Sequence, residues 1–228
     1  MAKQSEIWYG VPKMANKYEI VPVPTRILTI HDDIVEAIKE YGADKIGPGD
    51  VVCVAESVVA ITQGRAKRPE SFKPCFLAKV LSQLFPSQGS IAGWHSMQSL
   101  MEVEGQFRVL FAVIAGAVAK CFGVSGVFYR MGGEQAKLID DVTGTMPPYD
   151  KHIVYGPDRP AQVAEAITKA TGAYGAAIAD VNDLKRSCVL GVSQGVDSDE
   201  VAKILIDNPF GNASQKTPIV IIKNYRNK

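Results

Sequence analysis

The chain has 228 residues, which is enough for one large domain or two small ones, and its 46% hydrophobic and 21% charged residues are typical of a soluble globular protein. Its 25 Lys and Arg residues nearly balance its 24 Asp and Glu residues, so the formal net charge is +1. This balance excludes the strong positive field typical of proteins that bind nucleic acids or membrane surfaces. We therefore expect neither nucleic acid nor membrane as a partner.

The cysteine pattern and the first residues indicate a cytoplasmic protein. The cysteines are widely spaced and lack the Cys-x-x-Cys or Cys/His spacing of a zinc site, so we expect reduced thiols. They are Cys53, Cys75, Cys121 and Cys188. Residues 1–20 contain no apolar segment of the kind that forms the centre of a secretory signal.

The first part of the chain predicts strands around one helix. Residues 18–23 and 25–30 are rich in strand-forming residues, so each predicts a strand. Apolar residues recur at helical spacing in residues 33–41 after an acidic start, which predicts a helix that ends at Gly42. The continuous apolar run at residues 51–55 predicts a strand in the interior of a sheet.

The middle of the chain predicts mainly helices. Residues 74–85 and 94–103 have apolar residues at helical spacing. Residues 106–122 predict a buried core helix, because their apolar run is shorter than the ~20 residues of a membrane span. A short strand is predicted at residues 127–130.

The last part of the chain predicts two helices and three strands. Residues 158–171 have Pro160 in the first turn and Gly172 beyond the end, which is the proline-start, glycine-stop pattern of a helix. The other predicted elements are a buried strand at 173–179, a strand at 188–192, a helix after the capping-box spacing of 197–200 and a strand at 217–222.

The order of these elements predicts an α/β fold with a mixed sheet and flanking helices. Several strands follow one another directly, so an α+β fold remains the alternative. No repeat or low-complexity linker divides the chain. We therefore predict one domain over residues 1–228, which could consist of two subdomains.

Two acidic segments suggest a site for a divalent cation. Asp180 follows the buried strand predicted at residues 173–179, and Asp140 with Asp141 follows the apolar pair at residues 138–139. Hard cations such as Mg²⁺ are held by one or two carboxylates together with substrate phosphates. The alternative is that these carboxylates cap turns or helices, because aspartate side chains readily accept backbone N–H groups.

A third segment, residues 56–65, offers groups that could contact phosphate. It carries Ser57, Thr62 and Arg65 beside Gly64, directly after the predicted interior strand. The alternative is a second amphipathic strand that ends in a glycine turn, since no Gly-Lys-Ser or Gly-Lys-Thr follows. No Ser/His/Asp or Cys/His arrangement is recognisable, so the catalytic residues stay unassigned.

Several segments together resemble the coenzyme F-420:L-glutamate ligases, which add γ-linked glutamate to a deazaflavin coenzyme precursor. The segments that carry the resemblance are residues 24–38, 49–65, 138–141, 178–186 and 217–223. The resemblance implies an F-420 γ-glutamyl ligase-like fold and a homodimer. It also implies a small-molecule substrate, GTP or ATP as co-substrate, and Mg²⁺ or Mn²⁺ as cofactor.

The implied reaction is ligation through an acyl phosphate, in which the nucleotide phosphorylates an acid and the amine of L-glutamate, or of a similar amino acid, displaces phosphate. The implied metal ligands are Asp140, Asp141 and Asp180. The implied nucleotide-binding residues are Pro24, Thr25, Ser57, Thr62 and Arg65.

A different function remains open beside this one. Ile61 stands where the family has a lysine, and the segment after Asp180 is shorter than in the family. A non-catalytic or regulatory homologue that binds a nucleotide or a phosphorylated metabolite is therefore the alternative hypothesis.

Overall fold

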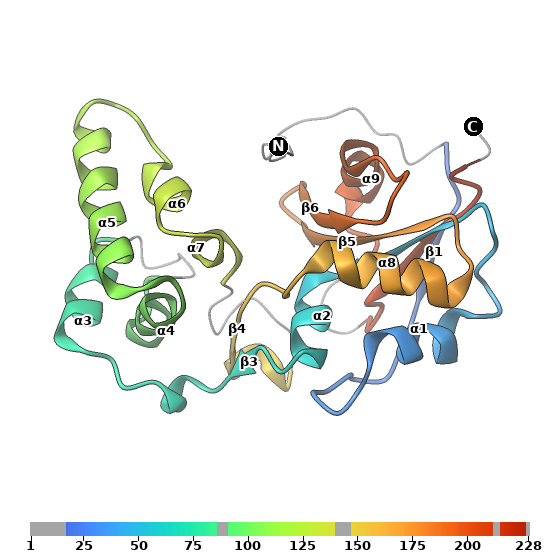
Figure 1. Cartoon of the computed structure of the whole chain (residues 1–228), viewed down its shortest axis with the longest axis horizontal. Helices are drawn as coiled ribbons and strands as arrows, with labels where there is room; N and C mark the ends of the chain where they lie inside the picture. Colours follow the sequence, from blue (N-terminus) through green and yellow to red (C-terminus); the bar gives the residue numbers. More distant parts are fainter. Residues whose placement is uncertain (1–16, 86–90, 140–146, 212–214, 227–228) are drawn as a thin grey trace. The chain divides into compact units, whose positions relative to one another are not determined.

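The structure is a computed structural model that describes residues 17–85, 91–139, 147–211 and 215–226. The described residues form two compact units. The first contains the residues up to 64 and from 157 onwards, and the second contains residues 65–156 (Figure 1). Within the described residues, no helix is both long enough and apolar enough to cross a membrane.

The first unit is built on a five-stranded sheet of order β1-β7-β2-β5-β6. Its strands are β1 (Ile20–Val23), β2 (Val51–Ala55), β5 (Gly175–Asn182), β6 (Arg186–Val192) and β7 (Ile219–Ile222). The strands β2 and β5 pair in parallel, whereas β1–β7, β2–β7 and β5–β6 are antiparallel. The predicted mixed sheet with flanking helices is thus confirmed.

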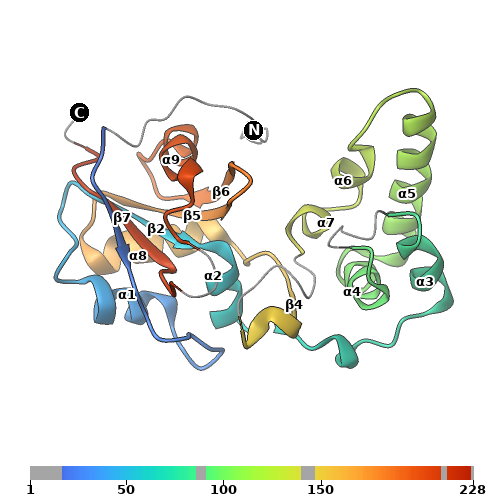
Figure 2. The ribbon, with the colours of Figure 1, turned by 180° about the vertical axis from the view of Figure 1, so that it is seen from behind.

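Helices cover both faces of this sheet, as the two opposite views show (Figures 1 and 2). One face packs against α1 (Ile34–Gly42), α2 (Glu56–Thr62) and α8 (Pro160–Thr171), and the other packs against α9 (Ser198–Ile204) and η3 (Leu205–Asp207). Side chains alternate between the faces along each strand. Val52 and Ile178 therefore lie in the first core, and Cys53 and Ala177 lie in the second.

The predicted helix ends are confirmed in this unit. The Asp33 carboxylate accepts the backbone N–H groups of Val35 and Glu36, which α1 would otherwise leave unbonded. Asp197 caps α9 in the same way. The helix α8 has Pro160 at its first position and ends at Gly172, whose φ of 70° is readily adopted by glycine.

The second unit is mainly helical and has its own apolar core. Its elements are β3 (Ala66–Lys67), η1 (Pro69–Ser71), α3 (Phe76–Ser82), α4 (Trp94–Glu104), α5 (Gln106–Cys121), α6 (Val127–Met131), α7 (Gln135–Leu138), η2 (Tyr149–Lys151) and β4 (Ile153–Val154). The short strands β3 and β4 form an antiparallel pair. The three longest helices confirm the helices predicted in the middle of the chain.

Two predicted strands, at residues 25–30 and 127–130, are wrong, and so is the alternative of a strand at residues 56–65. Residues 25–30 have no regular structure, because the Thr25 hydroxyl donates to the neighbouring carbonyl of Arg26 and the segment leaves the sheet edge after Pro24. Residues 56–62 form the helix α2, whose Val59 packs in the core. Residues 127–131 form α6, which places Phe128 in the second core.

The predicted buried core helix, α5, is a helix but is buried on one side only. Val109, Ala112 and Val113 are buried, and large apolar side chains on its other side are exposed to solvent. The sequence shows that α5 is apolar all round, but it does not show which surfaces cover it.

A buried ion pair ties the C-terminal part of the sheet to the loop before β2. The Asp50 carboxylate is almost fully buried and accepts hydrogen bonds from the Gly47 N–H (2.7 Å), the Asn224 N–H (2.8 Å) and the Lys223 ammonium (2.5 Å). Burial alone would raise the pKa of this carboxyl group, but the hydrogen bonds from Lys223, Asn224 and Gly47 outweigh it and lower the pKa.

We expect Asp50→Ala to lower the free energy of unfolding by about 3–5 kcal/mol, because it leaves the Lys223 ammonium partly buried without its counter-charge. The matched control is Asp44→Ala, whose exposed ion pair with Lys45 should contribute less than about 1 kcal/mol. Urea unfolding of both variants measures the difference. Equal losses in the two variants would contradict a structural role for Asp50.

The lowered pKa of Asp50 also predicts a pH dependence. The folded state holds this carboxyl group ionised more strongly than the unfolded chain does, so its contribution is complete above the unfolded pKa of about 3.9. The contribution is lost as pH falls through the lower folded-state pKa. Unfolding measured from pH 7 to pH 3 should therefore show a weaker acid sensitivity in Asp50→Ala than in the unchanged protein.

Candidate functional site

Two acidic residues lie at the same edge of the sheet in the first unit. The parallel pairing sets Ala55 at the end of β2 opposite Ala179 in β5. The residues that directly follow Ala55 and Ala179 are Glu56 and Asp180. The carboxyl ends of neighbouring parallel strands are a common place for ligands in α/β proteins.

The two carboxylates sit in different surroundings. Glu56 is the first residue of α2 and is 7% exposed, so its carboxylate is held within the protein. Asp180 is exposed to solvent, yet desolvation by the surrounding protein raises the pKa of its carboxyl group. By strand alternation Asp180 lies on the face of β5 that carries Ile178, which is the face covered by α2 and α8.

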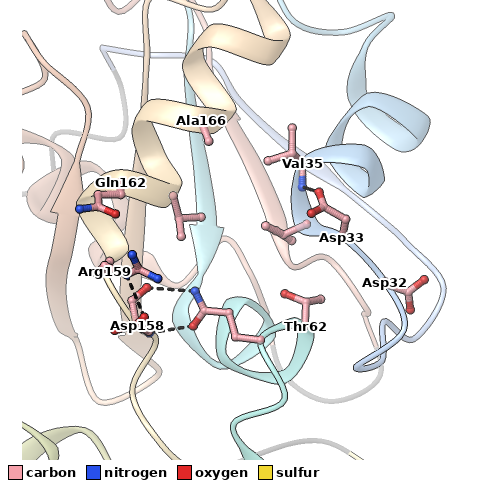
Figure 3. A pocket seen from close by; sticks show the side chains of 11 residues that line it. Asp32, Asp33, Val35, Thr62, Asp158, Arg159, Gln162 and Ala166 are labelled. Atoms are coloured by element: carbon pink, nitrogen blue, oxygen red, sulfur yellow. Dashed lines mark hydrogen bonds and ion pairs between the residues drawn. The ribbon is translucent and has the colours of Figure 1, made fainter.

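A hollow of about 310 Å³ lies at the other end of α2. Figure 3 shows Thr62 at the end of α2, Asp33 at the start of α1, and Asp158 with Arg159 at the start of α8 around this hollow. Its remaining lining residues are Asp32, Ile34, Val35, Gln63, Gln162, Val163 and Ala166. The volume is at the lower end of the range for small-molecule pockets.

The walls of the hollow are held by hydrogen bonds between the segments that form it. The Gln63 side chain accepts the Asp158 N–H (2.7 Å) and donates to the Asp158 carbonyl (2.9 Å), so the end of α2 is fastened to the segment before α8. The Thr62 hydroxyl donates to the Val59 carbonyl within α2 (2.9 Å). These contacts fix the hollow without any contribution from the second unit.

The charges in the hollow are already partly paired. A hydrogen-bonded ion pair with Arg26, together with bonds from Thr29, lowers the pKa of Asp32. Asp158 forms an exposed ion pair with Arg159 (2.9 Å). With three carboxylates and one arginine on its walls, the hollow is not by itself a site for a phosphate group.

The predicted nucleotide-binding residues are distributed over both units. Pro24 is exposed, whereas Thr25 is buried and its backbone N–H donates to the Lys216 carbonyl (2.9 Å). Ser57 lies in the first turn of α2 next to Glu56, and Thr62 lines the hollow. The structure therefore connects Ser57 and Thr62 through one helix.

Arg65 is the exception, since it belongs to the second unit. Its Nε donates to the Gly156 carbonyl (2.6 Å), and its guanidinium lies 5.6 Å from the ring centroid of Tyr155. Both contacts are internal to that unit. The predicted phosphate contact of Arg65 stays a prediction.

The predicted metal site is only partly described. Asp140 and Asp141 lie outside the described residues, so the predicted meeting of the two acidic segments stays a prediction. Among the residues that are described, no three or more His, Cys, Asp or Glu side chains are grouped to hold a metal ion. The prediction placed Asp180 after its strand. The structure places it inside β5, opposite Cys188.

Sequence reasoning missed Glu56. The residue directly follows an apolar strand, which is the same signal that singled out Asp180. A strand that continued through residues 56–65 would have no carboxyl end at Ala55, so the strand alternative hides this signal. Once α2 begins at Glu56, this carboxylate marks the carboxyl end of β2.

These features define a mixed-sheet α/β protein with two acidic residues, Glu56 and Asp180, where the pairing of its parallel strands ends. A family model described as F420-0:gamma-glutamyl ligase matches residues 22–179, which is more than half of the chain, and the chain therefore belongs to this family. The membership confirms the resemblance and identifies an enzyme of the γ-glutamyl ligase class. A search of curated proteins found no match.

The start of α8, which lines the hollow, depends on Gly191 in β6. A Cβ atom on Gly191 would overlap the backbone of Pro160 and Ala161. We expect Gly191→Ala to lower the free energy of unfolding by about 1–3 kcal/mol, because backbone atoms must shift to accommodate the methyl group.

The matched control for Gly191→Ala is Gly42→Ala, since a Cβ at Gly42 would meet only Ile46 at an ordinary 3.5 Å. This change lies in the last turn of α1 and should be neutral or stabilising by up to about 1 kcal/mol. Thermal unfolding compares the two. Equal stability of both variants would show that the close approach of β6 and α8 is not needed.

Proposed function

We propose that this chain is a nucleotide-dependent and divalent-metal-dependent ligase that joins an acid to L-glutamate, or a similar amino acid, through an acyl phosphate. Membership of the γ-glutamyl ligase family supports an amide-forming reaction. The observation that carries the proposal is the position of Glu56 and Asp180 at one edge of the sheet. A ligase that moves phosphoryl groups needs negative oxygens that can hold a cation beside the phosphates.

The residues at this edge fit a hard divalent cation such as Mg²⁺ or Mn²⁺. Such an ion is usually held by one or two carboxylates, with phosphate oxygens and water completing its coordination. Glu56 and Asp180 would supply these carboxylates, with Asp140 and Asp141 as further proposed ligands. When bound, the cation would neutralise the negative charge of the nucleotide phosphates during transfer.

The reaction we propose has two displacement steps. First, a carboxylate oxygen of the acid attacks the γ-phosphorus of GTP or ATP, the bond from this phosphorus to the bridging oxygen breaks, and the nucleoside diphosphate leaves. Second, the amine of L-glutamate attacks the acyl carbon, the bond from carbon to the phosphate oxygen breaks, and inorganic phosphate leaves while the amine loses a proton to solvent. Positioning and charge neutralisation are enough for both steps.

The helix α2 would position the nucleotide. Ser57 in its first turn lies beside the carboxylate edge, and Thr62 in its last turn lines the hollow. These two residues are about 7.5 Å apart along the helix axis, given a rise of about 1.5 Å per residue. We assign the phosphates to the Ser57 end and an uncharged part of the nucleotide or acid to the Thr62 end.

One observation favours the alternative of a non-catalytic homologue. Ile61 is 5% exposed and packs its apolar side chain inside the protein at the position where the family has a lysine. A homologue without that cation could bind a nucleotide or a phosphorylated metabolite and release it unchanged. The experiment below separates the two functions.

The decisive experiment follows the label of an ¹⁸O-carboxylate. The protein is incubated with GTP or ATP, Mn²⁺, L-glutamate and the acid F420-0, ¹⁸O-labelled in its carboxylate, and with a panel of other labelled acids. The proposal predicts an amide product and one ¹⁸O atom in the released phosphate. An amide without labelled phosphate would contradict the acyl phosphate, and nucleotide binding without turnover on any acid would establish the non-catalytic alternative.

We expect Glu56→Gln and Asp180→Asn each to weaken Mn²⁺ binding in the presence of GTP by at least ~10-fold, because each removes one charged oxygen ligand. The matched control is Asp44→Asn, an exposed carboxylate outside the site, which should bind Mn²⁺ as the unchanged protein does. Calorimetric titration measures the affinities. Unchanged Mn²⁺ affinity in both site variants would exclude this edge as the cation site.

The raised pKa of Asp180 adds a pH dependence to this binding. Protons compete with the cation for the carboxylate. As the pH is lowered, Mn²⁺ affinity should therefore begin to fall at a higher pH than it would with an ordinary aspartate, whose pKa is about 3.9. Asp180→Asn should lose this part of the dependence. The measurement is the same titration repeated between pH 7.5 and pH 4.5.

A further inference from the structure

The strand pair β3–β4 of the second unit carries two cationic side chains on one face. Its register sets Lys67 opposite Ile153, and the Tyr155 N–H donates to the Arg65 carbonyl (3.0 Å), so Arg65 lies opposite Tyr155. Residues two apart along a strand point to the same face, and residues directly opposite each other share a face. Arg65, Lys67 and Tyr155 therefore project from the same face of this pair.

Both cationic groups lie over one aromatic ring. The Arg65 guanidinium is 5.6 Å from the centroid of the Tyr155 ring, and the Lys67 ammonium is 5.7 Å from the same centroid and 5.9 Å from that of Phe72. Tyr155 and Phe72 are 4% and 5% exposed and belong to the core of the unit, so the two rings form a firm floor. The attraction between a cation and an aromatic face holds the two groups there without neutralising their charge.

Neither cationic group has a carboxylate partner within the part of the chain that the structure describes. The Arg65 Nε donates to the Gly156 carbonyl (2.6 Å), which fixes the plane of the guanidinium, and its two Nη groups donate to no described residue. This leaves the Nη edge for a paired contact with a carboxylate. Arg65 is half-buried and Lys67 is exposed, so a ligand in solvent can reach both.

One carboxylate, that of Glu102 on α4, also acts on this ring. Burial is the main cause that raises the pKa of the Tyr155 phenol; the negative charge of Glu102 adds to this effect and the positive charge of Arg65 opposes it. The Glu102 Oε1 accepts a hydrogen bond from the Gln98 Nε2 (2.9 Å), which restrains the carboxylate on its helix. Two positive charges and one negative charge are thus gathered around Tyr155.

This set of charges is complementary to an acidic amino acid. L-glutamate carries two carboxylates and one ammonium, and its carboxylate carbons are separated by four C–C bonds, or about 5 Å when extended. The backbone positions of Arg65 and Lys67 are about 7 Å apart, because they are two residues apart on a strand. Each cation can therefore meet one carboxylate. The phosphates of a nucleotide share bridging oxygens and lie closer together than this spacing.

We propose that Arg65 and Lys67 form a dicarboxylate site that binds the acidic amino acid of the ligase reaction, with one carboxylate on each cation and the ammonium paired with Glu102. The inference rests on the proposed function for the role of its ligand. It gives Arg65 a carboxylate to bind in place of the phosphate that the sequence suggested. The buried ring of Tyr155 keeps water from one side of the ligand and so strengthens these contacts.

The first test is a calorimetric titration of the full chain with L-glutamate, without nucleotide or metal. Lys67→Met removes the ammonium but keeps an apolar stem against the rings, and we expect it to weaken L-glutamate binding at least ~10-fold. Lys73→Met is the matched control, because Lys73 is exposed and lies outside the strand pair, so its affinity should be unchanged. No binding to the unchanged protein, or equal affinity in Lys67→Met, overturns the proposal.

A series of ligands tests whether both carboxylates are recognised. L-glutamine lacks the charge of the side-chain carboxylate, and the 1-amide of L-glutamate lacks the charge of the other. We expect each amide to bind the unchanged protein at least ~10-fold more weakly than L-glutamate. In Lys67→Met, one of the two amides should bind as well as L-glutamate does, because the charge that it lacks no longer has a partner. If both amides keep their full loss, the proposal is wrong. This comparison is made within one variant and does not depend on its stability.

Glutarate tests the role of Glu102, since it has both carboxylates but no ammonium. We expect L-glutamate to bind the unchanged protein more tightly than glutarate does, and the difference to disappear in Glu102→Gln, which keeps a hydrogen-bond acceptor for Gln98. Glutarate that binds the unchanged protein as tightly as L-glutamate would overturn the proposed arrangement.

Two further measurements separate this site from the nucleotide and from the reaction. If the two cations hold phosphates, Lys67→Met weakens GTP binding in the presence of Mn²⁺ and leaves L-glutamate binding unchanged, which overturns the proposal. Where an amide forms, Lys67→Met should raise the KM for L-glutamate at least ~10-fold and leave the KM for the nucleotide unchanged. L-glutamate binding that follows the predicted pattern supports the site even if the labelled acids give no amide, so failure of the reaction and failure of the site are distinguished.

Discussion

The parallel pairing of β2 with β5 is the interaction on which the first unit depends. The other pairs in the five-stranded sheet are antiparallel, and this one brings together strands that are more than a hundred residues apart in the sequence. A parallel pair needs a crossover between its strands. Here the crossover contains the whole second unit and α8, so this pairing alone sets the ends of β2 and β5 at one edge.

That edge gives the candidate site its chemistry. Had β2 and β5 been antiparallel, Glu56 and Asp180 would have lain at opposite ends of the sheet. In the parallel arrangement the fold holds one carboxylate inside the protein at the start of α2 and leaves the other exposed on β5. The raised pKa of Asp180 reflects its desolvation by the surrounding protein.

Local chemistry made several elements predictable. Asp33 and Asp197 cap their helices through their own side chains, and Pro160 with Gly172 bounds α8, so these ends are readable without any tertiary partner. The wrong strand predictions concern segments whose structure depends on contacts with other parts of the fold. Residues 56–62 include Val58, Val59 and Ile61, which favour a strand, yet they form α2 and pack Val59 into the core.

The same limit applies to the site and to α5. The apolar run before Asp180 indicates this residue in the sequence, whereas the place of Glu56 depends on the pairing of β2 with β5, which ends at Ala55 and Ala179. The apolar character of α5 correctly indicated burial, but a sequence does not say whether the burying surface belongs to the same molecule.

The place of β7 has a consequence for the order in which the chain acquires its structure. This strand, residues 219–222, lies between β1 and β2, so the two N-terminal strands have no direct contact with each other. During synthesis β1 gains its partner strand only after residues 219–222 are made, and β2 has no partner until β5 follows the second unit, which is one continuous stretch and is complete earlier. The second unit can therefore fold while β1 and β2 still lack partner strands, and unpaired strand edges of this kind are open to pairing with other chains.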